Sequence, residues 1–114
     1  MASVRSRADS KSNQLDRDRE FQRLIRAADN ALNNGDLVSP GSGSAWHYYN
    51  QALLVKPGNS QAKSGLEQVK QALADRAGAE IGAGEIAQAR STIADLERVE
   101  PNHSALAQLK RDIA

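Results

Sequence analysis

The sequence predicts an all-α protein made of stacked helices, and two observations support this. Nineteen of its 114 residues are alanine, whereas four are aromatic. Alanine is the best helix former, and a chain with few bulky side chains must bring its elements close together. The apolar residues also recur at helical spacing, and no segment alternates as a strand would. We therefore expect about five closely packed helices.

The composition excludes several classes of protein. The chain has no cysteine, and its formal net charge is +1. A disulfide scaffold and a thiolate metal site are therefore excluded, and no overall positive field attracts nucleic acid. No apolar run approaches the roughly 20 residues that span a bilayer, and no apolar stretch follows the basic N-terminus as in a signal peptide. We expect neither a nucleic-acid partner nor a membrane span in this chain.

Residues 1–14 are polar and rich in serine, so we expect a disordered lead-in. The first 26 residues carry seven positive and four negative charges, whereas the remainder carries eight and ten. This basic segment is expected to be a solvated tail. Its alternative role is to contact an acidic surface or lipid headgroups. The folded domain is expected over 15–114.

Residues 15–57 are predicted to form a first helix pair. Gly35 ends the first helix, and the loop over 38–44 is rich in Pro, Gly and Ser. Ser44 is a favourable N-cap for a second helix that runs to about Val55. The residues expected to face inward are Phe21, Leu24, Ile25, Ala28 and Leu32 in the first helix, and Ala45, Tyr49, Ala52 and Leu53 in the second.

Residues 60–101 are predicted to form a second pair, and 103–114 a C-terminal capping helix. Gly84 closes the first helix of this pair, and Asn102 or Ser104 caps the last helix. Small residues lie about 80° to one side of the apolar stripe of the long third helix, so we expect two neighbours, with the small residues at the tighter contact. The stripe comprises Ala62, Leu66, Val69, Leu73, Ala77 and Ile81, and the small residues are Gly65, Ala72, Ala79 and Ala83.

The two pairs are related by an internal repeat. At an offset of 44 residues, the second helices match: Ala45, Tyr49, Ala52, Val55 and Pro57 meet Ala89, Ile93, Leu96, Val99 and Pro101. At an offset of 49, the first helices match: Leu24, Ala28, Leu32 and Gly35 meet Leu73, Ala77, Ile81 and Gly84. The five additional residues fall in the loop over 38–44. A helix pair repeated at this period indicates a solenoid, whose units bury their faces by stacking.

The matched residues resemble the tetratricopeptide repeat. In that family, the second helix of each unit has a small residue, an aromatic, an alanine and a closing proline at spacings of four, three and five. Ala45, Tyr49, Ala52 and Pro57 stand at those spacings. The resemblance covers about residues 20–114, although the loop over 38–44 and the third helix are longer than the family's. It implies a right-handed α-solenoid of stacked antiparallel helix pairs, similar to diverged modules of larger bacterial proteins.

The resemblance also implies a binding groove. In the family, the first helix of each pair lines a concave surface, and a polar stripe on the third helix matches the groove-facing positions. Side-chain amides can pair with a peptide backbone, and arginines can pair with carboxylates. The alternative is a solvated helix face. The groove residues implied in this way are Arg19, Gln22, Arg26, Gln61, Ser64, Gln68, Gln71 and Asp75.

Trp46 marks a second candidate surface. It lies about 90° from the inward face of its helix, where the plainer expectation is packing on the neighbouring helix pair. If it is exposed beside the loop over 38–44, it would anchor a partner.

Catalytic chemistry lacks convergent groups in this sequence. His47 and His103 belong to no metal-binding pairing, and no nucleophile motif occurs. The GxGxxA match over 82–87 follows a helix and not a strand, so a turn between helices explains it. We expect no enzymatic activity, no cofactor and no metal.

The predicted function is protein–protein interaction, as a module of a larger bacterial protein or assembly that binds a peptide or helix of its partner. The alternative is a structural role as a homo-oligomer, because the last helix of a solenoid exposes an apolar face when nothing stacks on it. The compartment stays open. A fragment of a membrane-anchored protein would lie on the cytoplasmic or periplasmic side of the bacterial envelope.

Overall fold

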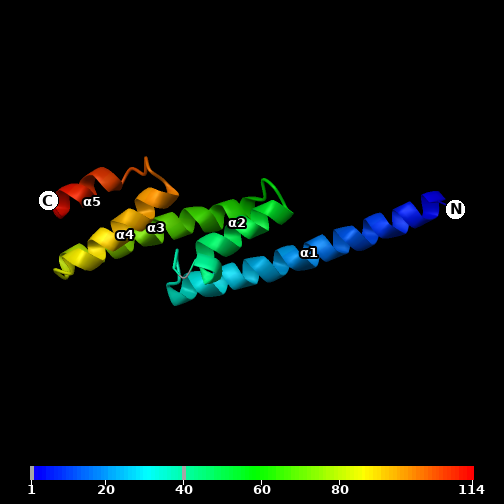
Figure 1. Cartoon of the computed structure of the whole chain (residues 1–114), viewed down its shortest axis with the longest axis horizontal. Helices are drawn as coiled ribbons and strands as arrows, with labels where there is room; N and C mark the ends of the chain where they lie inside the picture. The colour runs from blue at the N-terminus through cyan, green and yellow to red at the C-terminus, as the bar shows by residue number, and fades with distance from the viewer. Residues whose placement is uncertain (1, 40) are drawn as a thin grey trace. The chain divides into compact units, whose positions relative to one another are not determined.

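The computed structural model describes residues 2–39 and 41–114, with side chains described over 13–39 and 42–114. Its five α-helices pack in adjacent pairs, and the described residues contain no strand (Figure 1). The all-α fold of about five helices is confirmed. The helices are α1 (Ala2–Asn34), α2 (Ala45–Val55), α3 (Ser60–Gly82), α4 (Ile86–Val99) and α5 (Leu106–Asp112), and a 3-10 turn, η1 (Gly41–Gly43), precedes α2.

The chain forms two compact units, Met1–Gly65 and Leu66–Ala114. The boundary falls inside α3 and not at the break after Pro57, where the sequence divides the helix pairs. The first unit holds α1, η1, α2 and the first six residues of α3. The second holds the rest of α3 with α4 and α5.

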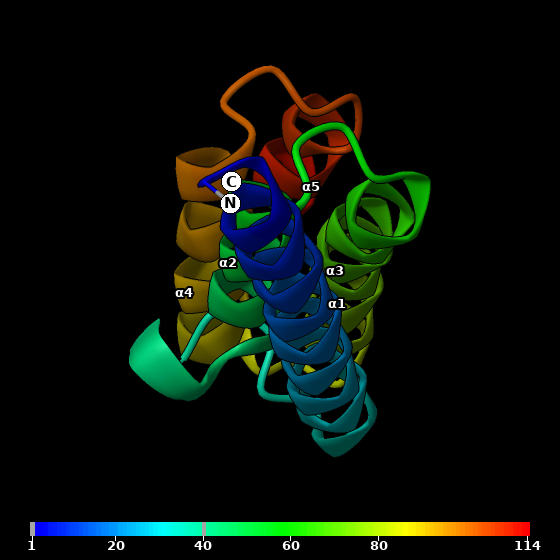
Figure 2. The same cartoon turned by 90° about the vertical axis from the view of Figure 1, so that its right-hand side faces the viewer.

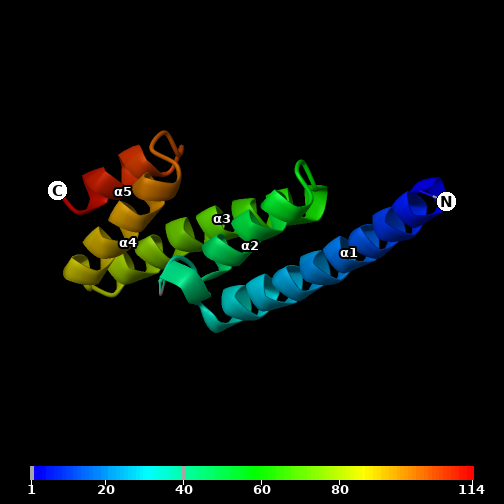
Figure 3. The same cartoon turned by 45° about the vertical axis from the view of Figure 1, so that its right-hand side comes forward.

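The segment over 1–14, for which the sequence predicts a disordered lead-in, belongs from Ala2 onward to α1, which runs for 33 residues. No proline or glycine occurs between Ala2 and Asn34, so nothing in this segment breaks a helix. A periodic pattern of apolar residues indicates which face of a helix is buried, so a helix that buries no face lacks this pattern. As a result, α1 extends past the C-terminal end of α2 (Figure 3). The solvated tail, and its alternative contact with an acidic surface or lipid headgroups, concern side chains that lie mostly outside the described residues.

The first unit is built by packing α1 against α2. The predicted inward residues of α1 are buried, except that Leu32 is half-buried and Ala31 is buried in its place. Ser44 caps α2 as predicted, and its side-chain oxygen accepts from the backbone N–H of His47 at 3.2 Å. The turn η1 lies beside α2 (Figure 2).

Two glycines end the first helices of the two pairs in the same way, as predicted. Gly35 and Gly84 have φ angles of 80° and 78°, in the left-handed region that favours glycine. After Gly35, the N–H of Asp36 donates to the carbonyl of Ala31 at 2.9 Å; after Gly84, the N–H of Glu85 donates to that of Glu80 at 2.8 Å. This six-to-one bond is the Schellman termination, and it recurs at the 49-residue offset of the sequence repeat.

The tight contact predicted for the small residues of α3 is present at Gly65. A Cβ atom at this position would lie 2.3 Å from Cε1 and 2.5 Å from Cζ of the Tyr49 ring. Tyr49 is 2% exposed, so its ring has no free space to move into. Glycine at position 65 therefore lets α3 pack against the aromatic ring of α2.

The second unit pairs the end of α3 with α4 and covers α4 with α5. Glu80 accepts from the buried Thr92 hydroxyl at 2.6 Å, and Lys70 bonds Glu100 at 2.8 Å. Ala89, Ile93 and Leu96 of α4 and Leu106 and Leu109 of α5 are buried. The helices α4 and α5 lie side by side (Figure 3).

The predicted cap of the last helix was wrong. The α5 N-cap position is Ala105, and its backbone N–H donates to Nδ1 of His103 at 3.1 Å. An imidazole two residues upstream therefore accepts a hydrogen bond at the start of the helix, where Asn102 or Ser104 was expected to act as the cap. In this arrangement His103 has a structural role.

Candidate functional site

A shallow hollow of about 630 Å³ runs along the exposed face of α1. The three groove residues predicted on this helix, Arg19, Gln22 and Arg26, are all exposed and all line it. With Leu15, they follow one another at spacings of four, three and four residues, so they form a single row along the helix. The other lining residues are Asp18, Arg23, Ala27 and Asn30.

The charges around this hollow divide into paired and unpaired groups. Asp18 pairs with Lys56 at 2.8 Å, and Arg23 donates to Glu20 at 2.5 and 3.0 Å. The hydrogen bond from Arg23 lowers the pKa of Glu20, and the same bond raises the pKa of the Arg23 guanidinium.

Arg19 and Arg26 lack such neighbours. Among the residues whose side chains are described, none forms a hydrogen bond or ion pair with either guanidinium. Once the internal pairs are set aside, the hollow therefore presents two unneutralised positive charges on one row of α1.

The predicted groove residues of α3 are also exposed. Gln61 and Ser64 belong to the first unit but do not line the hollow along α1. In the second unit, Gln71 donates to the carboxylate of Asp75 at 3.0 Å, whereas Gln68 is exposed with no interaction among the described side chains. The structure thus brings three of the eight predicted residues together in one lining.

Trp46 is half-buried at the start of α2. Its backbone N–H donates to the carbonyl of Leu37 at 3.0 Å, and its carbonyl accepts from the Asn50 amide at 2.9 Å. These bonds fix the backbone of the helix start. The role of the indole as an anchor stays a prediction.

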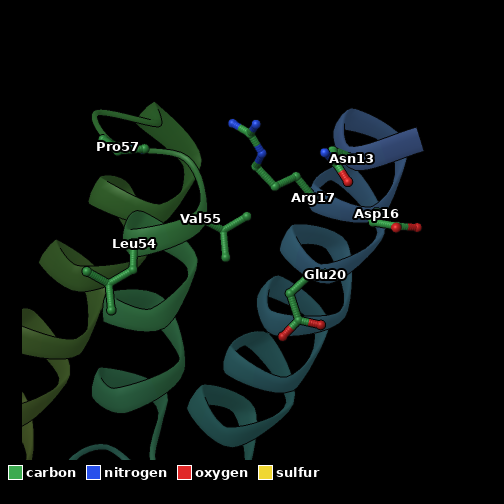
Figure 4. Close-up of a pocket in the computed structure, with 7 residues that line it drawn as sticks. All are labelled: Asn13, Asp16, Arg17, Glu20, Leu54, Val55 and Pro57. Carbon is green, nitrogen blue, oxygen red and sulfur yellow. The ribbon is translucent and has the colours of Figure 1, made fainter. Parts of the chain in front are cut away.

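A second cleft, which the sequence did not predict, lies between α1 and the C-terminal end of α2 (Figure 4). Its volume is about 690 Å³. Figure 4 shows Arg17 of α1 and Val55 of α2 extending into the gap from opposite sides. The rest of the lining combines apolar residues of the α2 end with an amide and two carboxylates of α1: Leu54, Pro57, Asn13, Asp16 and Glu20. The signal that could have revealed it is Leu54, which is 74% exposed and outside the inward stripe of α2.

Among the described residues, no three His, Asp or Glu side chains lie close enough together to hold a metal ion. The most strongly perturbed group is Tyr49, whose pKa is raised first by burial and then by its hydrogen bond to Asp29 at 2.5 Å. Its phenol is therefore held protonated inside the helix pair. Over the part of the chain described, no helix has the length and apolar character of a membrane span.

Comparisons with known proteins place no relative beside this chain: no family model, curated protein or solved structure matched it.

Proposed function

We propose that this chain is a protein–protein interaction module that holds a peptide or helix of its partner in the hollow along α1. The observation that carries the proposal is the row of Arg19, Gln22 and Arg26, exposed in one hollow, where neither guanidinium group pairs with any described side chain. A guanidinium offers several fixed donors, and an amide offers both a donor and an acceptor. Such side chains recognise the polar groups of another protein.

The repeat supports a binding role of the kind found in stacked helix pairs. Gly35 and Gly84 end equivalent helices with equivalent backbone bonds, so the helix pair recurs in backbone geometry as well as in sequence. This recurrence and the spacing of Ala45, Tyr49, Ala52 and Pro57 support a tetratricopeptide-like unit. In that family the first helix of a pair faces the bound peptide, and α1 is the first helix of its pair.

A selection experiment tests the proposal. A display library of random 16-residue peptides is panned on the wild-type chain, and the selected peptides are then titrated against two variants. In the groove variant, Arg19→Ala, Gln22→Ala and Arg26→Ala are combined. In the control, Arg90→Ala removes an exposed arginine of α4.

We expect the selected peptides to lose most of their affinity for the groove variant and to keep it for the control. Circular dichroism should be unchanged in both variants, because the four side chains are exposed. Peptides that bind the groove variant as well as the wild type would rule out the hollow along α1 as the binding site.

We propose self-association as the second candidate function. The apolar residues of α5 do not favour it, because Leu106 and Leu109 are buried within the chain. The exposed Leu54 beside Val55 and Pro57 does favour it, since an apolar strip on the surface gains from being covered. Sedimentation velocity over a hundredfold concentration range tests this function. A dimer that dissociates in Leu54→Gln would support it, and a single monomeric species at every concentration would refute it.

A further inference from the structure

We infer that the occupant of the hollow along α1 is an acidic helix that carries two carboxylates seven residues apart. This inference rests on the proposed function and names the chemical class of the partner. Two features of the hollow define this class: the positive sign of its charges and the spacing of the residues along the row.

The charge of the hollow selects an acidic occupant. Asp18 is neutralised by Lys56 and Arg23 by Glu20, so the internal pairs leave Arg19 and Arg26 as the net charge. A carboxylate is the group that a guanidinium binds best, because two parallel N–H donors match its two oxygens. Two cations in one hollow therefore call for two acidic groups and repel a basic segment.

The spacing of the row selects a helix. Leu15, Arg19, Gln22 and Arg26 follow at intervals of four, three and four, which is the interval of a helix-packing seam. Arg19 and Arg26 are two turns apart, so their Cα atoms are separated by about 10.5 Å along the axis. A partner helix alongside α1 presents carboxylates at the same separation when they occupy positions i and i+7.

The ends of the row provide apolar contact for the same helix. Leu15 is 56% exposed at one end, and the half-buried Ala27 lies next to Arg26 at the other. A leucine between the two acidic positions of the partner would pack beside Gln22, which is exposed. The occupant is thus amphipathic, with a narrow stripe of acidic and apolar residues.

The probe is a fluorescein-labelled, alanine-rich 18-residue peptide, solubilised by glutamine, with Glu at i and i+7 and Leu at i+3 and i+4. Three peptides serve as controls. One has Gln at both acidic positions. One has its acidic residues at i and i+5, which places them on different faces of the helix. One has Pro at its centre, which breaks the helix. Affinities are measured by fluorescence anisotropy at low and at physiological salt.

We expect the Glu peptide to bind about 25-fold more tightly than the Gln peptide, since an exposed charge pair contributes up to about fivefold and two pairs multiply. Arg19→Gln and Arg26→Gln should each reduce the affinity for the Glu peptide by about fivefold and leave the Gln peptide unchanged. Arg90→Gln should change neither. The i,i+5 and Pro peptides should bind no better than the Gln peptide, and added salt should weaken the Glu peptide most.

Equal binding of the Glu and Gln peptides would overturn the acidic occupant, and equal binding of the Pro peptide would overturn the helix. These failures differ from failure of the proposed function. If library peptides still bind through Arg19, Gln22 and Arg26 while the designed peptide does not, the interaction module stands and its acidic-helix partner is refuted.

Discussion

The two helix pairs bury equivalent positions with different chemistry. In the first pair, Tyr49 is 2% exposed at the middle of α2, and its hydroxyl donates to Asp29 on α1. The repeat offsets of 44 and 49 residues assign these two positions to Ile93 and Gly78 in the second pair. Ile93 is also buried, at 4% exposed, but it has no polar atom to satisfy. The second pair instead joins its helices by a neighbouring hydrogen bond, from Thr92 to Glu80.

The residue that ends the second helix of each pair also differs in chemistry: it is a lysine in the first pair and a glutamate in the second. Lys56 and Glu100 both cap the second helix of their pair, and both donate a backbone N–H to the fourth residue upstream. Lys56 bonds Asp18 at 2.8 Å, and its ammonium lies 4.9 Å from the centre of the Phe21 ring. The position of Phe21 in the second pair is taken by Lys70, which bonds Glu100.

This difference between the pairs disfavours exchanged helix partners, by the modest energy of exposed charge pairs. If α1 packed on α4 in the equivalent register, Asp18 would face Glu100. If α3 packed on α2 in that way, Lys70 would face Lys56. Like charges in these positions disfavour both exchanges, whereas the native pairs each bring opposite charges together. The two helix pairs therefore share their helix-ending turns and their buried positions, whereas their polar contacts differ.

The largest effect is expected from Gly65→Ala. The new methyl group would overlap the Tyr49 ring, so we expect the free energy of unfolding to fall by about 1–3 kcal/mol. The matched control is Gly78→Ala in the same helix, where a Cβ atom meets nothing within 4 Å. There alanine should stabilise the chain by up to about 1 kcal/mol through helix propensity. Urea unfolding followed by circular dichroism measures both, and equal signs for the two variants would contradict the tight contact.

The next effect is a loss of stability at alkaline pH that belongs to the first pair alone. Burial and the bond to Asp29 raise the pKa of Tyr49 above its unfolded value of about 10. Its contribution to stability is therefore complete below pH 10 and is lost as the pH rises beyond it, by about 1.4 kcal/mol per pH unit. Tyr49→Phe should lack this loss, whereas Tyr48→Phe should retain it. Urea titrations between pH 8 and 11 would reveal the difference, and parallel curves for wild type and Tyr49→Phe would exclude it.

A smaller effect is expected from Tyr49→Phe at neutral pH. The variant keeps the ring against Gly65 and loses the hydrogen bond to Asp29, so we expect a cost of about 1 kcal/mol. Asp29→Asn should lose less, because its amide oxygen still accepts from the hydroxyl. A double-mutant cycle between the two positions isolates their coupling, and a coupling of zero would show that the bond contributes nothing to stability.

The smallest effect is expected from reversing the closing charges. Lys56→Glu places like charges at Asp18 and removes the cation from Phe21, which should cost about 0.5–1 kcal/mol at low salt. Adding Asp18→Lys should restore most of the lost stability. In the second pair, Glu100→Lys should lower the melting temperature slightly, and Lys70→Glu should restore it. Rescue that persists unchanged in 1 M salt would argue against an electrostatic cause.

Sequence reasoning succeeded where a local rule decides the structure. Ser44 as a cap, and Gly35 and Gly84 as helix ends, depend on a few adjacent residues, and the structure confirms all three. It was less informative where a segment lacks a helical pattern of apolar residues. The segment before Asp16 has no stripe, so its helix could not be distinguished from disorder. The cap of α5 was missed because histidine is not among the preferred capping residues.

The candidate site was predicted in part, again where residues close in sequence decide the arrangement. Arg19, Gln22 and Arg26 share one helix, so their spacing was enough to place them in one row. The pairing of Asp18 with Lys56 joins residues 38 positions apart, so the sequence could not show that Asp18 is neutralised by a residue of another helix and not by Arg19 beside it. The cleft beside Leu54 likewise depends on where α2 ends against α1, which no local pattern encodes.

The two ends of the loop before α2 lie next to each other. The N–H of Ala45 donates to the carbonyl of Asp36 at 2.7 Å and that of Trp46 to the carbonyl of Leu37 at 3.0 Å, so two adjacent backbone bonds join the end of α1 to the start of α2. A loop closed in this way can be lengthened at a cost of only about 0.6 kcal/mol for each doubling of its length. We expect this position to accept a grafted epitope, a fluorescent reporter or a second binding domain without disturbing either helix. The five residues that separate the two offsets of the repeat are already an insertion at this place.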